Sequence, residues 1–69
     1  MSVRQDEIQK INLELLIDGS SVSEVLDMIG TICSEKGEHI RRNWQDEPLA
    51  RRWERAGKQC DSLSDSIGL

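Results

Sequence analysis

Residues 26–67 decide the fold; their sequence is LDMIGTICSEKGEHIRRNWQDEPLARRWERAGKQCDSLSDSI. Its apolar residues form two rows with helical spacings of three and four, one on each side of the turn-forming segment 43–48. When the chain is folded back at this segment, the two rows match layer for layer, and the residue numbers in each layer add to 92–94. The layers are Trp44 with Leu49, Ile40 with Trp53, Lys36–Gly37 with Ala56–Gly57, Cys33 with Cys60, Ile29 with Leu63, and Leu26 with Ile67. The pattern predicts an antiparallel helical hairpin, with helices over 22–43 and 47–67.

The residues at the ends of these two helices are typical caps. Ser21 is followed three residues later by Glu24, which is the capping-box spacing, and predicts a helix that begins at Val22. Asp46 or Glu47 caps the following helix, since Pro48 then falls in a first turn where its missing N–H costs nothing. Gly68 is expected to end that helix.

Small residues at Gly30, Ser34 and Gly37 weaken the helix over 22–43. We favour the interpretation that they allow close packing against Ala56–Gly57. A groove for a partner helix, and a break of the helix at Gly37, are the alternatives that the sequence leaves open.

The N-terminal segment predicts a helix over residues 3–18. Ser2 and Gln5 have the capping-box spacing, and Gly19 is placed to stop the helix. Apolar residues fall on one side of this helix at Ile8, Ile11, Leu15 and Leu16. Residues 10–18 also alternate between apolar and polar, with apolar Ile11, Leu13, Leu15 and Ile17, which would suit a strand. A strand followed by two helices is similar to the ribbon-helix-helix layout of small DNA-binding dimers, but Leu16 breaks the alternation, so we favour helix.

Size and composition limit what one copy can build. The chain has 69 residues, is 36% hydrophobic, and contains two Trp but no Phe or Tyr. A domain of this length buries only about 60% of its unfolded surface, so its core is thin. Oligomerisation is a common remedy in so small a chain. We therefore expect a single all-α domain over residues 1–69, as a homodimer with a four-helix or six-helix core.

The net charge of −4 is unevenly distributed. Residues 1–37 carry −4, residues 38–58 carry +2 and residues 59–69 carry −2. This balance argues against bulk DNA binding, which is usually the work of a net positive domain. The two cysteines, the lack of an apolar leader, and a longest apolar run of only residues 15–17 predict a soluble cytoplasmic protein that does not enter membranes.

Five arginines gather near the predicted end of the hairpin, together with a tryptophan. Arginine and tryptophan are enriched at binding hot spots, and the guanidinium fork suits carboxylates and phosphates. The sequence therefore predicts a partner-binding surface for an acidic protein. A nucleic-acid backbone and the acidic N-terminal half of a second copy of this chain are alternative targets, and an ordinary solvated surface is the competing explanation. Its residues are Arg41, Arg42, Trp44, Arg51, Arg52 and Arg55.

Cys33 and Cys60 share a predicted layer, so a thiol redox pair is conceivable, although buried structural thiols are the commoner case. His39 is the only histidine and no zinc motif accompanies it, so we expect no metal and no other cofactor. No nucleophile motif or phosphate loop occurs, and we expect no enzyme. The sequence thus predicts a small adaptor or regulator that binds another macromolecule.

Overall fold

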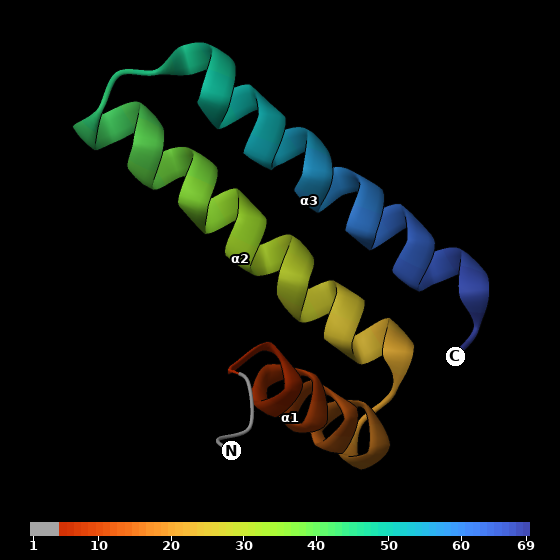
Figure 1. Cartoon of the computed structure of the whole chain (residues 1–69). Helices are drawn as coiled ribbons and strands as arrows, with labels where there is room; N and C mark the ends of the chain where they lie inside the picture. Colours follow the sequence, from red (N-terminus) through yellow and green to blue (C-terminus); the bar gives the residue numbers. More distant parts are fainter. Residues whose placement is uncertain (1–4) are drawn as a thin grey trace.

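The computed structural model describes residues 5–69, and in that range it contains three helices and no strand. They are α1 (Gln5–Gly19), α2 (Val22–Asn43) and α3 (Glu47–Ile67). Helices α2 and α3 lie side by side and antiparallel, while α1 lies across the N-terminal end of α2 (Figure 1). The predicted all-α hairpin is confirmed. Residues 10–18 are helical, so the strand alternative is wrong, and α2 continues through Gly37 without a break. The predicted cap at Ser2 and helix start at Val3 lie outside the described residues.

Local signals fix the ends of the hairpin helices. The Ser21 hydroxyl accepts a hydrogen bond from the Glu24 N–H at 3.0 Å, and the Asp46 carboxylate accepts one from the Leu49 N–H at 3.1 Å. Gly68 follows α3 with φ +66°, in the left-handed region that glycine adopts without strain. These three predicted caps are confirmed.

Small residues, seven apart, form the centre of the contact between α2 and α3. Gly57 is so close to α2 that a Cβ placed on it would lie 2.9 Å from the Gly30 carbonyl oxygen. A Cβ on Gly37 would lie 3.0 Å from the Ala50 carbonyl oxygen. At the open end of the hairpin the Ser23 hydroxyl donates to the Ser64 carbonyl at 3.0 Å, and the Ser64 hydroxyl donates to the Ser23 carbonyl at 2.7 Å. The facing rows are Ser23, Gly30 and Gly37 on α2, and Ser64, Gly57 and Ala50 on α3.

This contact corrects the predicted layers. The residue numbers of the facing pairs add to 87, not to 92–94. On α3, Ala50 follows Leu49 and Ser64 follows Leu63 by a single position, and one position is a rotation of about 100° around the helix. The large apolar rows therefore flank the contact instead of filling it, because small side chains let the two backbones approach more closely. The predicted close packing is correct for Gly30 and Ser34, which lie against Gly57. Gly37 lies instead against Ala50 and Glu54.

The core of the single chain is thin, as its size predicts. Among the described residues the only buried hydrophobic ones are Val25, Cys33 and Ala50, and no large side chain is fully buried. Helix α1 has no buried residue at all, and it packs against α2 alone. The molecule is flat, with extents of 40 × 36 × 13 Å, and its radius of gyration of 14.5 Å exceeds the value of about 11 Å for a compact domain of this length. One copy leaves much of its apolar surface uncovered.

Candidate interaction surfaces

The apolar side chains near the turn form one continuous surface, here called the tip face. One shallow hollow is lined by Leu49, Arg52, Trp53 and Ala56. A second hollow is lined by Ile40, Trp44, Asp46 and Leu49, so the two adjoin at Leu49. Trp44 is 73% exposed although it is the largest apolar side chain in the second hollow. The tip face thus exposes the Trp44 side chain to solvent beside the aliphatic side chains of Ile40 and Leu49.

The apolar rows continue from the tip face toward the open end of the hairpin. Leu63 lies seven residues after Ala56 on α3 and is 46% exposed. On α2, Ile29 lies one turn before Cys33 and is 38% exposed. These side chains repeat with the helical periodicity of core residues, but they are exposed to solvent as surface residues are. The tip face together with Ile29 and Leu63 is called the apolar face below.

Helix α1 has a second exposed apolar surface. Ile8, Ile11 and Leu15 have the helical spacings of three and four, and they are 46%, 55% and 65% exposed. Leu13 and Leu16 are each 45% exposed. The contact of α1 with α2 leaves these side chains exposed, and α1 joins the hairpin through the short connection at Ser20–Ser21.

Arg41 is directed into the hairpin end rather than toward a partner. Its Nε and NH2 donate to both carboxylate oxygens of Glu47, the closer contacts being 2.8 Å. Its NH1 and NH2 donate to the carboxylate of Glu54, each at 2.8 Å. These hydrogen bonds to Glu54 and Glu47 raise the pKa of the guanidinium, and the bonds from Arg41 lower the pKa of both carboxyls. Arg41 joins the end of α2 to the start of α3, so we assign it a role in holding the turn.

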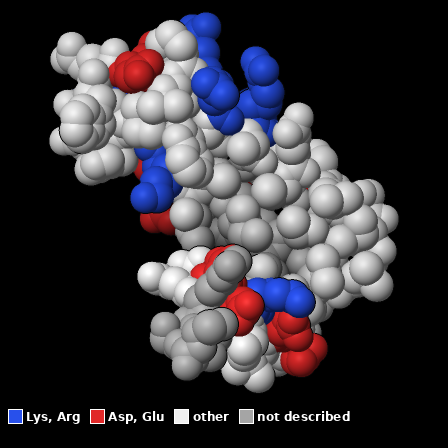
Figure 2. Space-filling view, viewed as in Figure 1, with Lys and Arg blue, Asp and Glu red and all other residues white. Residues whose placement is uncertain are grey.

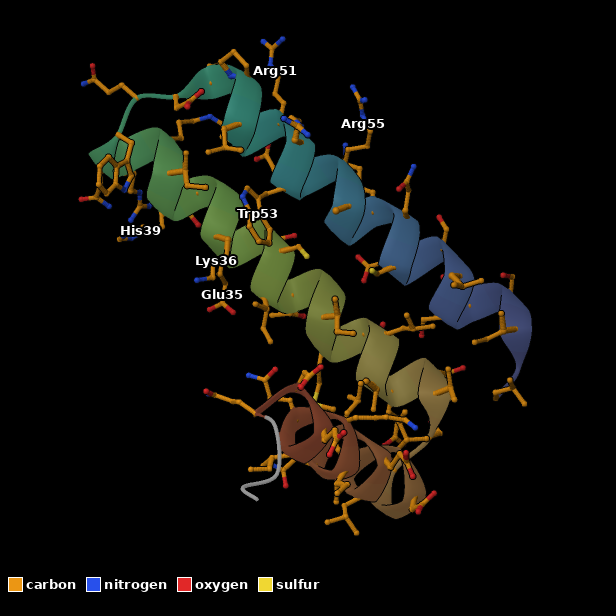
Figure 3. The ribbon with its side chains drawn as sticks, in the orientation of Figure 1. Glu35, Lys36, His39, Arg51, Trp53 and Arg55 are labelled. Carbon is orange, nitrogen blue, oxygen red and sulfur yellow. The ribbon has the colours of Figure 1, made fainter. Side chains whose placement is uncertain are left out.

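The other four arginines lie on different sides of the hairpin. Arg42 pairs with Glu38 along α2, and Arg51 lies 3.5 Å from a Glu47 oxygen that Arg41 already contacts. Figure 3 shows Arg51 and Arg55 extending from the side of α3 that faces away from α2. Arg52 borders the tip face. The structure thus divides the predicted cluster. Arg41 holds the turn, Arg51 and Arg55 form an outward basic surface, and Arg52 borders the tip face.

Both cysteines are free thiols. Cys33 is 7% exposed, and its Cβ lies 3.3 Å from the position that a Cβ on Gly57 would take, which makes it part of the close contact between α2 and α3. Cys60 is half-buried. The ring of His39 contacts the Asn43 amide at 3.1 Å through Nδ1. Within residues 5–69 no three His, Cys, Asp or Glu residues group in a way that could hold a metal ion.

None of the described helices is long and apolar enough to cross a membrane. Comparisons of the chain with protein-family models, curated proteins and solved structures give no match. Its function therefore has to be argued from its own surfaces.

Proposed function

We propose that this chain is a small cytoplasmic interaction protein that works as a homodimer, and that it acts as an adaptor or regulator by binding another macromolecule and not by catalysis. The observation that carries the proposal is the apolar face, whose side chains have core periodicity but remain 37–73% exposed at Leu49, Ile29, Leu63 and Trp44. A pair of helices forms a single layer, and stable domains bury such a face against a second layer. A second copy of the same chain supplies that layer.

The surface area supports a dimer of substantial size. A compact monomer of 7.9 kDa has an accessible surface of about 4,400 Å². This chain exposes 5690 Å². The excess of about 1,300 Å² per copy corresponds to about 2,600 Å² for two copies, which falls in the range of 2,000–5,000 Å² or more that is typical of obligate homodimers. The excess accessible surface is thus large enough to make a stable interface.

The outward basic surface of α3 is the proposed site for the second macromolecule. Arg51 and Arg55, which extend from the side of α3 turned away from α2 (Figure 3), line it together with Lys58. Glu54 lies at its edge, toward α2. Glu54 already binds Arg41, and Arg51 lies within 3.5 Å of Glu47. Arg55 and Lys58 form no ion pair with any described residue. Guanidinium groups bind carboxylates in a bidentate way, so an acidic protein segment is the partner that this surface fits best.

Self-association is tested by the absolute mass in solution, with light scattering after size-exclusion chromatography. Wild type is expected at twice 7.9 kDa. Leu63→Asp should give a folded monomer, because a carboxylate in the interface would be buried without a partner, whereas the 46% exposure of Leu63 in one copy leaves the hairpin intact. The matched control is Ser62→Asp, at a neighbouring exposed position outside the apolar row, and it should remain a dimer. A monomeric wild type over the whole concentration range would refute the homodimer.

Nucleic-acid binding is the second candidate, because Arg51, Arg55 and Lys58 form an exposed basic surface that also suits phosphates. Salt distinguishes the two. Each phosphate contact releases counterions, so affinity for an oligonucleotide should fall steeply between low and moderate salt if these residues contact the backbone. Binding that is absent at low salt would leave the acidic protein segment as the partner.

A further inference from the structure

The two ends of the hairpin carry opposite charge. The base, defined as residues 5–35 and 59–69, holds one basic and nine acidic side chains. The tip, defined as residues 36–58, holds seven basic and four acidic side chains. Figure 2 shows the difference on one side of the molecule, where Lys and Arg gather over the end of the hairpin and Asp and Glu gather over α1. The charge of the chain is therefore polarised along the hairpin.

Helix α1 lies at the end that suits its charge least. It contains four acidic residues and one lysine, and its nearest hairpin segment, the first part of α2, adds Glu24 and Asp27. The end of α3 adds Asp61 and Asp65 to the same end of the molecule. Like charges at the same end of the molecule repel, and α1 has no buried side chain to offset that repulsion. Its own hairpin thus leaves the apolar row of α1 exposed and brings no opposite charge to it.

The tip face provides both. Its apolar hollows contain Ile40, Trp44 and Leu49, and Arg52 borders them on α3. Lys36 lies four residues before Ile40 on α2, which places it on the same side of that helix. Neither Arg52 nor Lys36 forms an ion pair with any described residue. The tip face is therefore an apolar surface with two unpaired cations at its border, and the one carboxylate that lines it, Asp46, accepts a hydrogen bond from the Leu49 N–H as the cap of α3.

The exposed side of α1 is complementary to this surface. Glu7 and Asp18 stand four residues before and seven residues after Ile11, so both lie on the same side of the helix as its apolar row. An acidic helix with an apolar row fits an apolar surface with basic borders by both area and charge. In a homodimer such a helix is present at the same concentration as the surface that it fits.

We propose that two copies pair antiparallel, so that α1 of each copy lies on the tip face of the other. This inference rests on the proposed homodimer and adds its geometry. A two-fold axis makes the two contacts identical, so each α1 gains a cover and both exposed Trp44 side chains are buried. A parallel pair would place tip against tip and base against base, which brings like charges together at both ends.

Charge reversal tests the geometry on the full chain. The tip variant is Lys36→Glu with Arg52→Glu, and the α1 variant is Glu7→Lys with Asp18→Lys. The dimer dissociation constant is measured by sedimentation equilibrium at low salt. Each variant should weaken the dimer about tenfold or more, since each contact occurs twice and changes from attraction to repulsion. The combined variant, with all four changes in one chain, should return to within about threefold of wild type.

The design separates specific contacts from overall charge. The α1 variant moves the net charge from −4 to zero. If general repulsion between acidic copies governed assembly, this variant would strengthen the dimer, which is the opposite sign to our expectation. A wild-type monomer overturns the homodimer itself. A wild-type dimer that neither variant weakens, or that the combined variant fails to restore, overturns only the antiparallel geometry.

Fluorescence gives an independent measurement. In Trp53→Phe the only tryptophan is Trp44, which is 73% exposed in one copy. Its emission should shift to shorter wavelength as the concentration rises through the dissociation constant, and in the α1 variant that shift should occur at higher concentration. Emission that stays at the wavelength of a solvated indole in the fully formed dimer would show that α1 does not cover the tip face.

Discussion

Replacing Gly57 by alanine tests the close contact between α2 and α3. Alanine is better than glycine in a helix interior by about 0.5–1 kcal/mol, so helix propensity alone predicts a gain in stability. The structure predicts a loss. The new methyl group would lie 2.9 Å from the Gly30 carbonyl oxygen, 3.2 Å from the Ser34 hydroxyl and 3.3 Å from the Cys33 Cβ.

The carbonyl oxygen belongs to the backbone of α2, so it cannot rotate away as a flexible side chain would. The two helices have to separate by several tenths of an ångström, and overpacking of this kind costs about 1–3 kcal/mol. After subtraction of the propensity gain, the free energy of unfolding should fall by about 1 kcal/mol, and the melting temperature by about 4–8 °C.

The matched control is Gly19→Ala, because a Cβ at Gly19 has nothing within 4 Å and its φ is not positive. That variant should be neutral or slightly more stable, since it keeps the propensity gain without a clash. Both variants are compared with wild type by urea denaturation followed by far-UV circular dichroism, at one protein concentration because a dimer's stability depends on it. If Gly57→Ala were as stable as Gly19→Ala, α2 and α3 would not be in contact at Gly57, and the small-residue rows could not form the centre of the hairpin.

Two further predictions concern Arg41 and the cysteines. Because Arg41 lowers the pKa of Glu47 and Glu54 below the ordinary 4.5, its stabilising effect is present above that pH and is lost as the pH falls through the lowered values. In denaturant titrations, the free energy of unfolding of wild type should therefore fall more between pH 6 and pH 2 than that of Arg41→Met. Equal losses would show that Arg41 does not hold the turn through Glu47 and Glu54. Cys33 is buried and Cys60 half-buried, so a thiol reagent should label Cys60 first and Cys33 only on unfolding. A two-hydrogen mass loss under mild oxidant would instead support the redox pair.

The helices and their ends could be predicted from the sequence because their signals are local. Ser21 and Asp46 cap the residues that follow them by three positions, and Gly68 takes a backbone conformation that few other residues tolerate. None of these depends on what lies across the fold. The apolar spacing on either side of residues 43–48 likewise indicated two helices with a reversal of the chain direction between them, so the hairpin could be predicted without tertiary information.

The sequence did not reveal which side of each helix faces the other. Two rows with helical spacing run along α3. One contains the large apolar residues at 49, 53 and 63, and the other contains the small residues at 50, 57 and 64. Hydrophobicity favours the first row as the contact, and the spacing of seven shared by Ala50, Gly57 and Ser64 was the signal that was missed. Only close approach of two backbones favours the second row, and that approach is a property of both helices together.

The predicted binding surface was similarly resolved by packing. The sequence places five arginines near the turn. It does not show which guanidinium group holds the turn and which ones face solvent. Once the hairpin places Glu47 and Glu54 beside Arg41, that arginine is occupied, while Arg52 borders an apolar surface and Arg55 points outward. The sequence by itself determined where the helices begin, end and reverse, because those interactions lie within a few residues. Tertiary structure decided which side chains were left uncovered, because exposure depends on atoms far along the chain.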